Sequence, residues 1–242
     1  SSMSENSAIW HPCPLRRVGS GSHHHFYGYY NKHPWDRSGR YLLAQRVPMM
    51  TAFLTGVEVA EVGYFDLQNG DQFIAVGETT AWNWQMGSQL QWFGGLSGRR
   101  LIYNSRASSS DADYPYADFR ATAVDVETQA SEEFPLPIYV LAPSGKWALC
   151  VDYSRFEVTH PTIGYRSSHG EPSLANAPDD DGIYRMEIDS GDAELILSLR
   201  GLTQFQPLPS MDKAIHWVTH LEINPASTQF LFIHRWTERV ED

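Results

Sequence analysis

The stretch HFYGYYNKHPWDRSGRYLLAQRV, at residues 25–47, holds the pattern that decides the fold: an aromatic strand, a turn at 36–39 and an apolar strand. The same unit returns at residues 84–106, 137–153 and 217–236, with no helical period between the copies. Each unit of such a repeat buries its apolar face only against its neighbours. The repeat therefore predicts an all-β protein made of consecutive β-propeller blades, whose central funnel is the usual ligand site.

Further strands between the hairpins complete each blade. Asn69-Gly70, for example, joins two strand-like runs and is a strong hairpin signal. Counting strands predicts an N-terminal segment, 1–22, and a partial propeller, 23–242, of about three and a half four-stranded blades. Rings usually close with about 4–8 blades. We therefore expect part of a larger ring: a fragment, a chain whose C-terminal blades are missing, or a homo-oligomer. A β-sandwich is the alternative architecture.

Composition excludes several classes of protein. Hydrophobic residues make up 42% of the 242 residues and aromatic residues 13%, which predicts a globular chain. The net charge of −11 argues against a nucleic-acid partner, and no apolar run approaches the ~18 residues of a membrane span. Cys13 and Cys150 alone support neither a disulfide framework nor a cysteine metal site. No secretory signal is visible, which leaves bacterial cytoplasm or periplasm open.

Histidines in the last hairpin are candidate metal ligands. His216 and His220 lie four residues apart on a predicted strand, roughly 13 Å at ~3.3 Å per residue, too far to share an ion. His220 and His234 could approach each other across the hairpin, so we expect these two to hold a metal. A metal site needs at least three ligands, and the alternative is a set of hydrogen-bonded core histidines.

The segment that leads into the first strand predicts a substrate contact at the mouth of the funnel. We expect His24 or His25 to face the ligand, the alternative being a solvated loop. In the run TTAWNWQMG, Trp84 could stack on a sugar ring while Gln85 binds hydroxyl groups, although packing between blades explains tryptophans equally well. Trp35, in the first hairpin, is predicted to be a buried aromatic.

A long predicted loop, 154–181, carries the candidate catalytic residues. Loops of this length in compact domains are usually functional or disordered. β-Elimination on a uronate needs a cation or metal at the carboxylate, a base for the C5 proton and an acid for the leaving oxygen. Arginine, tyrosine and histidine suit these roles, and the loop supplies Arg155, Tyr165, Arg166 and His169. A solvated surface flap is the alternative.

One segment resembles a known family. Residues Gly28-Tyr29-Tyr30-Asn31-Lys32-His33-Pro34-Trp35, followed by Ser38-Gly39-Arg40-Tyr41, resemble TolB-like propellers of the oligogalacturonate-lyase kind, and in particular an uncharacterised group with the motif Gly-Tyr-Tyr-Asp-Lys-x-Pro-Trp. Asn31 stands where that motif has aspartate. The resemblance extends over residues 24–236, mostly through generic hairpin signatures, so it bears on fold more than on activity.

The resemblance implies a chemistry. Oligogalacturonate lyases are manganese-dependent propellers that cleave short pectin fragments by β-elimination, with an arginine as base and a histidine cluster, with a glutamine, around the metal. It implies that Arg155 is the base and that His220 and His234 bind manganese or another divalent metal. The proline that follows the first histidine in that family is missing here, and the remaining ligands would fall beyond Asp242.

Two functional hypotheses result. In the first, the propeller binds an acidic oligosaccharide in its funnel and cleaves it by metal-assisted β-elimination. In the second, it is a non-catalytic platform for a protein or a glycan. The lyase hypothesis requires His220, His234 and Arg155 to converge on one site.

Overall fold

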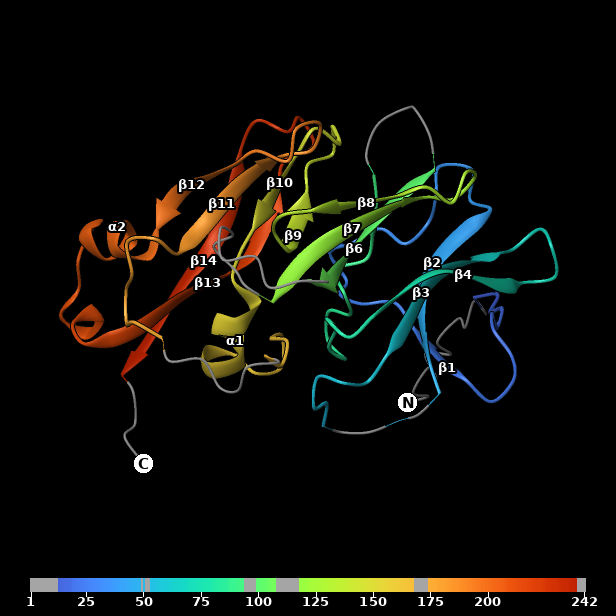
Figure 1. The fold of residues 1–242 in the computed structure, drawn as a ribbon, viewed down its shortest axis with the longest axis horizontal. Helices are drawn as coiled ribbons and strands as arrows, with labels where there is room; N and C mark the ends of the chain where they lie inside the picture. Colours follow the sequence, from blue (N-terminus) through green and yellow to red (C-terminus); the bar gives the residue numbers. More distant parts are fainter. Residues whose placement is uncertain are drawn as a thin grey trace, which may run out of the picture.

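The computed structural model describes residues 13–48, 50, 53–93, 99–107, 118–167 and 174–238. Within these residues the chain forms four antiparallel sheets of four, four, four and two strands, and the predicted all-β class is confirmed. The sheets follow one another across the molecule in sequence order, from the blue first sheet to the orange and red strands (Figure 1). None of the described helices is long and apolar enough to cross a membrane.

The first two sheets are simple meanders, in which each strand pairs with the next one along the chain. The first sheet contains β1 (His24–Phe26), β2 (Tyr41–Val47), β3 (Ala60–Asp66) and β4 (Gln72–Thr79). The second contains β5 (Gln91–Trp92), β6 (Arg100–Arg106), β7 (Phe119–Asp125) and β8 (Ser131–Phe134).

The third sheet repeats the meander, and the fourth holds one hairpin of described strands. The third contains β9 (Ile138–Leu141), β10 (Trp147–Cys150), β11 (Gly182–Glu187) and β12 (Ala193–Ser198). The fourth contains β13 (Ala214–Ile223) and β14 (Phe230–Glu238). The short helical segments are α1 (Tyr153–Thr159), α2 (Leu199–Gln204) and η1 (Pro209–Met211).

Most of the predicted turns are confirmed. Gly39, Gly70 and Gly145 have φ of 68°, 69° and 71°, a left-handed conformation that glycine adopts without steric cost. The turn expected at 96–98 lies outside the described residues. The predicted loop at 154–181 begins instead with helix α1, because the Asp152 side chain accepts a hydrogen bond from the Ser154 N–H and caps the helix.

Aromatic side chains fill the core around the third sheet. Tyr139, Tyr153 and Tyr165 are each at most 1% exposed, and the rings of Tyr153 and Tyr165 stack at 4.2 Å.

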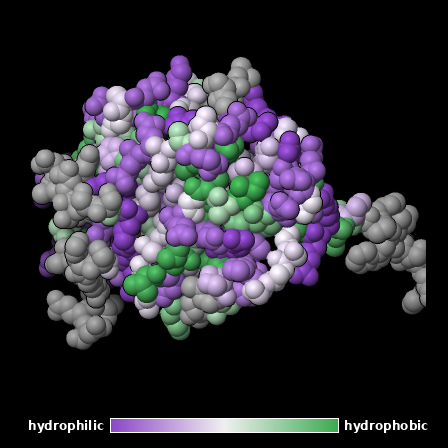
Figure 2. Space-filling view, turned by 45° about the vertical axis from the view of Figure 1, so that its right-hand side comes forward, coloured by the Kyte–Doolittle hydropathy of each residue, from purple (hydrophilic) through white to green (hydrophobic). Residues whose placement is uncertain are grey.

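Trp35 does not belong to this core. It is 41% exposed, because it precedes β2 at the edge and forms only an isolated bridge with Leu42. The prediction of a buried Trp35 is therefore wrong. Elsewhere the surface is mainly hydrophilic, with apolar side chains gathered in the middle of one face (Figure 2).

Buried amide side chains connect one sheet to the next. Gln45 of β2 donates to the Tyr27 carbonyl at 2.5 Å and accepts from the Ser88 N–H at 2.8 Å. Asn104 of β6 forms both bonds with the backbone of Ile138, which begins β9. Because both amides are 0% exposed, each bond replaces one that water would otherwise supply. The sheets are thus held in register with their neighbours by paired side-chain-to-backbone bonds.

We expect Gln45→Leu to lower the free energy of unfolding by about 2–4 kcal/mol, because leucine fills a similar volume but leaves a buried N–H and a buried carbonyl unpaired. Gln72→Leu, at an exposed position on β4, is the matched control and should change it by less than about 0.5 kcal/mol. Urea unfolding measures both variants. Equal losses of stability in the two variants would show that the Gln45 amide does not stabilise the contact between the first and second sheets.

Candidate functional site

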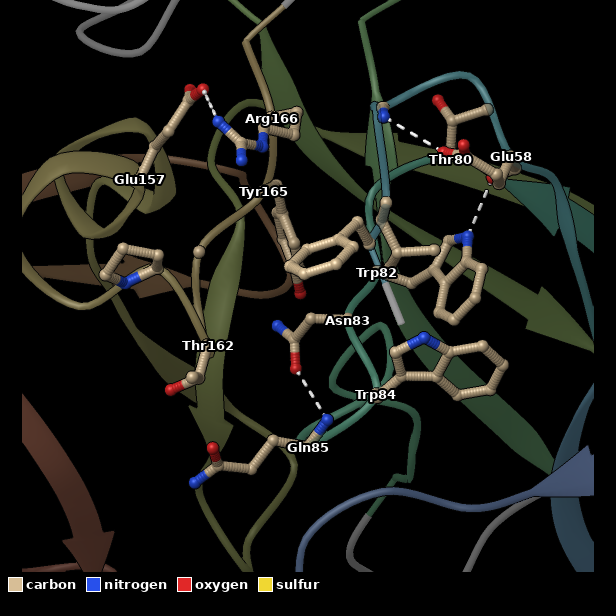
Figure 3. Close-up of a pocket in the computed structure, with 15 residues that line it drawn as sticks. Glu58, Thr80, Trp82, Asn83, Trp84, Gln85, Glu157, Thr162, Tyr165 and Arg166 are labelled. Atoms are coloured by element: carbon tan, nitrogen blue, oxygen red, sulfur yellow. Dashed lines mark hydrogen bonds and ion pairs between the residues drawn. The ribbon is translucent and has the colours of Figure 1, made fainter. Parts of the chain in front are cut away.

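A cavity of about 550 Å³ opens between two segments far apart in sequence, residues 80–85 after β4 and residues 157–166 from α1 onward. Figure 3 shows Trp82 and Trp84 on one wall, with Glu157 and Arg166 on the opposite side. Residues 53–58 complete the lining. We call this cavity the tryptophan pocket.

Three aromatic rings build the tryptophan wall. Trp82 is 3% exposed, and its indole N–H donates to the Glu58 carbonyl at 2.7 Å, so its position is fixed by the core. The Trp84 ring stands nearly perpendicular to it, at 88° and 4.8 Å between centroids. Phe26 packs against both indoles. Trp84, which is only partly buried, therefore offers the pocket a rigid aromatic surface.

Asn83 shapes the loop between these tryptophans and Gln85. Its side-chain oxygen accepts from the Gln85 and Met86 N–H groups, at 3.1 and 2.7 Å. Gly87 closes the turn with φ of 61°, and a Cβ there would lie 2.0 Å from Gln45 Nε2, so only glycine fits. The Asn83 Nδ2 is buried, has no hydrogen-bond partner among the described residues, and lies on the cavity side in Figure 3.

The charges of the tryptophan pocket include two carboxylates and one guanidinium. Glu157 forms an ion pair with Arg166 at 3.2 Å and accepts from the Ser167 N–H at 2.8 Å. Burial raises the pKa of Glu58, but hydrogen bonds from Thr55 and Gly56 outweigh it, so the net pKa is lowered. The anionic form of Glu58 is thus favoured, and the lining, with two acidic residues and one arginine, carries no surplus positive charge for a uronate.

The structure brings part of the predicted catalytic set to this pocket. Tyr165 and Arg166 line it, together with the predicted substrate contacts Trp84 and Gln85. Tyr165, however, is 1% exposed, and its hydroxyl accepts from Asn104 Nδ2 at 3.1 Å. Burial raises the pKa of the Tyr165 phenol, so it is an inert part of the cavity wall. His169 lies outside the described residues.

Arg155 lies elsewhere, in a buried network. It is 4% exposed, and its Nε donates to the His216 carbonyl at 2.7 Å. One terminal nitrogen donates to the carbonyls of Ala175 and Asn176, and the other forms an ion pair with Asp181 at 3.3 Å. The guanidinium therefore ties α1 to β13 and to the segment before β11. This placement does not fit the base that the lyase hypothesis requires.

The predicted metal pair is separated by a bulge in the last hairpin. The register shifts between Thr219 and Glu222, where His220 has φ of 56°. The His220 ring bonds the Thr219 hydroxyl at 2.9 Å and faces the Tyr29 ring. His234 lies opposite Val218 in the ladder. The hairpin therefore does not form the expected pair of His220 and His234.

His234 pairs instead with His216. Its Nε2 lies 2.9 Å from His216 Nδ1, and His216 Nε2 donates to the Met211 carbonyl at 3.0 Å. Burial, together with His216, lowers the pKa of His234 to about 4, so the ring is neutral near pH 7. The described residues hold no group of three or more metal-ligating side chains. This arrangement does not fit the manganese site that the resemblance implies.

The two remaining predicted contacts line a second, neighbouring hollow of about 400 Å³, to which His24 and His25 belong. Trp84 lines both hollows. The sequence did not point to four polar residues of the tryptophan pocket, because segments remote from one another supply them and no local motif marks them: Glu58, Thr80, Glu157 and Thr162.

Two of three comparisons with known proteins found no match, and the third found a weakly similar solved structure. No family model matches the chain, and no curated protein matches it. Among solved structures, the isopeptidase AtxE2 in its apo form aligns at 8% identity with a TM-score of 0.39. The alignment covers 89% of this chain and 36% of that one, so this chain spans about a third of that structure's length. A likeness of this size carries no argument about fold or function.

Removing the Arg155 guanidinium should destabilise the fold. We expect Arg155→Met to lower the free energy of unfolding by about 3–5 kcal/mol, because it removes a buried guanidinium that bonds Asp181 and three backbone carbonyls. Arg166→Met is the control: it removes a half-exposed ion pair worth about 1 kcal/mol or less. A stable Arg155→Met protein would refute the structural role and return Arg155 to the candidates for catalysis.

Asp152, beside this network, should make stability depend on pH. Burial raises its pKa to about 7, aided by the Asp181 carboxylate, above the ordinary value of about 3.9. The protonated acid therefore stabilises the fold at low pH, and that contribution is lost as pH rises from about 4 through about 7.

Asparagine at position 152 stays neutral and can still cap α1. We expect Asp152→Asn to gain about 1–3 kcal/mol of unfolding free energy over wild type at about pH 8, and little at about pH 4. Urea titrations of both proteins across this range measure the difference, in which the titration of groups remote from Asp152 and Asp181 cancels. A difference that does not change with pH would contradict the assignment.

Proposed function

We propose that this chain is part of a β-propeller that binds a glycan in the tryptophan pocket, without cleaving it. The observation that carries the proposal is the composition of that pocket. It combines a rigid tryptophan face with amide and hydroxyl groups in a cavity of about 550 Å³. This volume lies within the range of about 300–1,000 Å³ that is usual for small-molecule sites.

The sheet topology supports the propeller part of the proposal. Three consecutive four-stranded meanders, each paired in sequence order, are what blades require. The second strand of one sheet bonds the start of the next sheet, as when Asn104 of β6 bonds Ile138 at the start of β9. The first strand of the fourth sheet, β13, contacts β9, the first strand of the third sheet. Blades arranged around an axis would place their inner strands near one another in this way.

The chemistry of a sugar matches the pocket. A pyranose has an apolar C–H face, suited to an aromatic ring, and a rim of hydroxyl groups that need hydrogen-bond partners. Trp84 supplies the face, and Asn83 and Gln85 supply amide groups from the same loop. Thr162 adds a hydroxyl from the opposite side (Figure 3). The two carboxylates and one guanidinium favour an uncharged ring over a uronate at this position.

Binding fits the geometry better than elimination does. A lyase needs its base, acid and carboxylate-neutralising group within reach of one sugar. Arg155 is committed to backbone carbonyls, and Tyr165 is buried with a raised pKa. His220 and His234 bond different partners. The groups expected to act together are thus distributed over separate parts of the fold.

Trp84→Ala tests this function. We expect the variant to lose at least about tenfold in affinity for any glycan that the wild type binds, equivalent to about 1.4 kcal/mol of binding free energy. A glycan array identifies the ligand, and titration calorimetry measures the affinity. Trp35→Ala removes an exposed indole outside the pocket and should bind as the wild type does. No binding on the array, or equal losses for both variants, would contradict the proposal.

A further inference from the structure

The second hollow adjoins the tryptophan pocket across an aromatic ridge. We call it the histidine hollow; Arg17, His23, His24 and His25 line it together with Trp84. Phe26 also lines it, and its ring contacts Trp82 and Trp84 at 5.4 and 5.1 Å. Trp84 therefore lines both hollows, and a ligand that binds against it could extend into both.

The two hollows differ in charge. The described lining of the histidine hollow includes one arginine and three histidines but no aspartate or glutamate. The neighbouring Glu61 carboxylate accepts hydrogen bonds from two of the three guanidinium nitrogens of Arg46, at 2.6 and 2.8 Å. Its charge is thus largely neutralised. The tryptophan pocket, by contrast, carries two carboxylates against one guanidinium.

His25 forms the rigid back of the histidine hollow. Its ring packs against Phe65 and Phe73, at 5.0 and 5.4 Å between centroids. Gly19 lies over it with φ of 88°, and a Cβ there would come within 3.1 Å of His25 Nδ1. The Nε2 atom is buried and has no hydrogen-bond partner among the described residues. This nitrogen is shielded from solvent, so the His25 ring contributes to the shape of the hollow.

Burial lowers the pKa of His25, and Arg46, His23 and His24 lower it further against the opposing effect of Glu61. His25 is therefore neutral near pH 7. His23 and His24 are exposed beside Arg17. Arg17 supplies positive charge to this hollow, and the two exposed imidazoles add ring nitrogens that can donate hydrogen bonds.

We propose that the histidine hollow is a subsite for an anionic substituent, a carboxylate or a sulfate ester, of the same glycan whose uncharged ring lies on Trp84. This inference rests on the proposed function. Arg17, His23 and His24 supply charge-assisted hydrogen bonds to the anion, and the acidic tryptophan pocket rejects it. The charge contrast thus sets the direction in which the glycan lies across Trp84.

Matched glycans test the subsite. An array carries neutral oligosaccharides, each beside derivatives with one uronate or one sulfate. The measured quantity is the preference, the affinity for the anionic member of a pair over that for the neutral one. We expect a preference of about tenfold, and the two derivatives distinguish carboxylate from sulfate.

Variants assign the preference to named residues. The double variant His23→Gln/His24→Gln and the single variant Arg17→Gln should each reduce the preference. His33→Gln is the matched control, because His33 is exposed and lines neither hollow. It should keep the wild-type preference.

Three results would overturn the inference. If the wild type binds glycans in a Trp84-dependent way, but equally well with and without an anionic group, the subsite is refuted and the proposed function stands. A preference that survives in the double variant and in Arg17→Gln refutes the assignment to the histidine hollow. No binding of any array member refutes both the pocket and its subsite.

Discussion

Every polar backbone group that folding buries at the joints between sheets needs a hydrogen-bond partner, and the rest of this structure depends on how that need is met. At the end of one sheet and the start of the next, no strand continues the ladder. Gln45 and Asn104 meet the need with side-chain amides, whose donor and acceptor match a backbone carbonyl and N–H. Such bonds are directional, so they hold adjacent sheets together and also fix the orientation of one sheet relative to the next.

The same demand explains why a candidate catalytic arginine is structural. Beyond the third sheet, the joint to β13 involves the segment at 175–176, which lies outside the strands and whose Asn176 carbonyl also accepts from the His216 N–H of β13. Arg155 supplies several N–H donors in a planar fork and so satisfies three carbonyls at once. A guanidinium used in this way has no capacity left to accept a proton from a substrate.

The proposed binding site forms where these joints leave space. The amide of Gln45 holds the loop that carries Trp84, through Ser88 and beside Gly87, while α1 and the residues after it form the facing wall. Because each wall is anchored to the core, the cavity is shaped before a ligand arrives, which lowers the entropic cost of binding. The charge contrast between the two hollows then follows from which loops meet on each side of Trp84.

The alternation of aromatic strands and Gly-containing turns determined by itself that the chain forms antiparallel meanders, because strand period and turn conformation are local properties. It also marked Trp84, Gln85 and Arg166 as candidates, since exposed aromatic and polar residues in loops are chemically conspicuous. Only the tertiary structure decided which candidates meet. A bulge at Thr219 moved His220 away from His234, and a capped helix turned Arg155 inward. Glu58 joined the site from a loop and Glu157 from helix α1, about a hundred residues apart in sequence, a proximity that depends on how whole sheets pack and that no local pattern encodes.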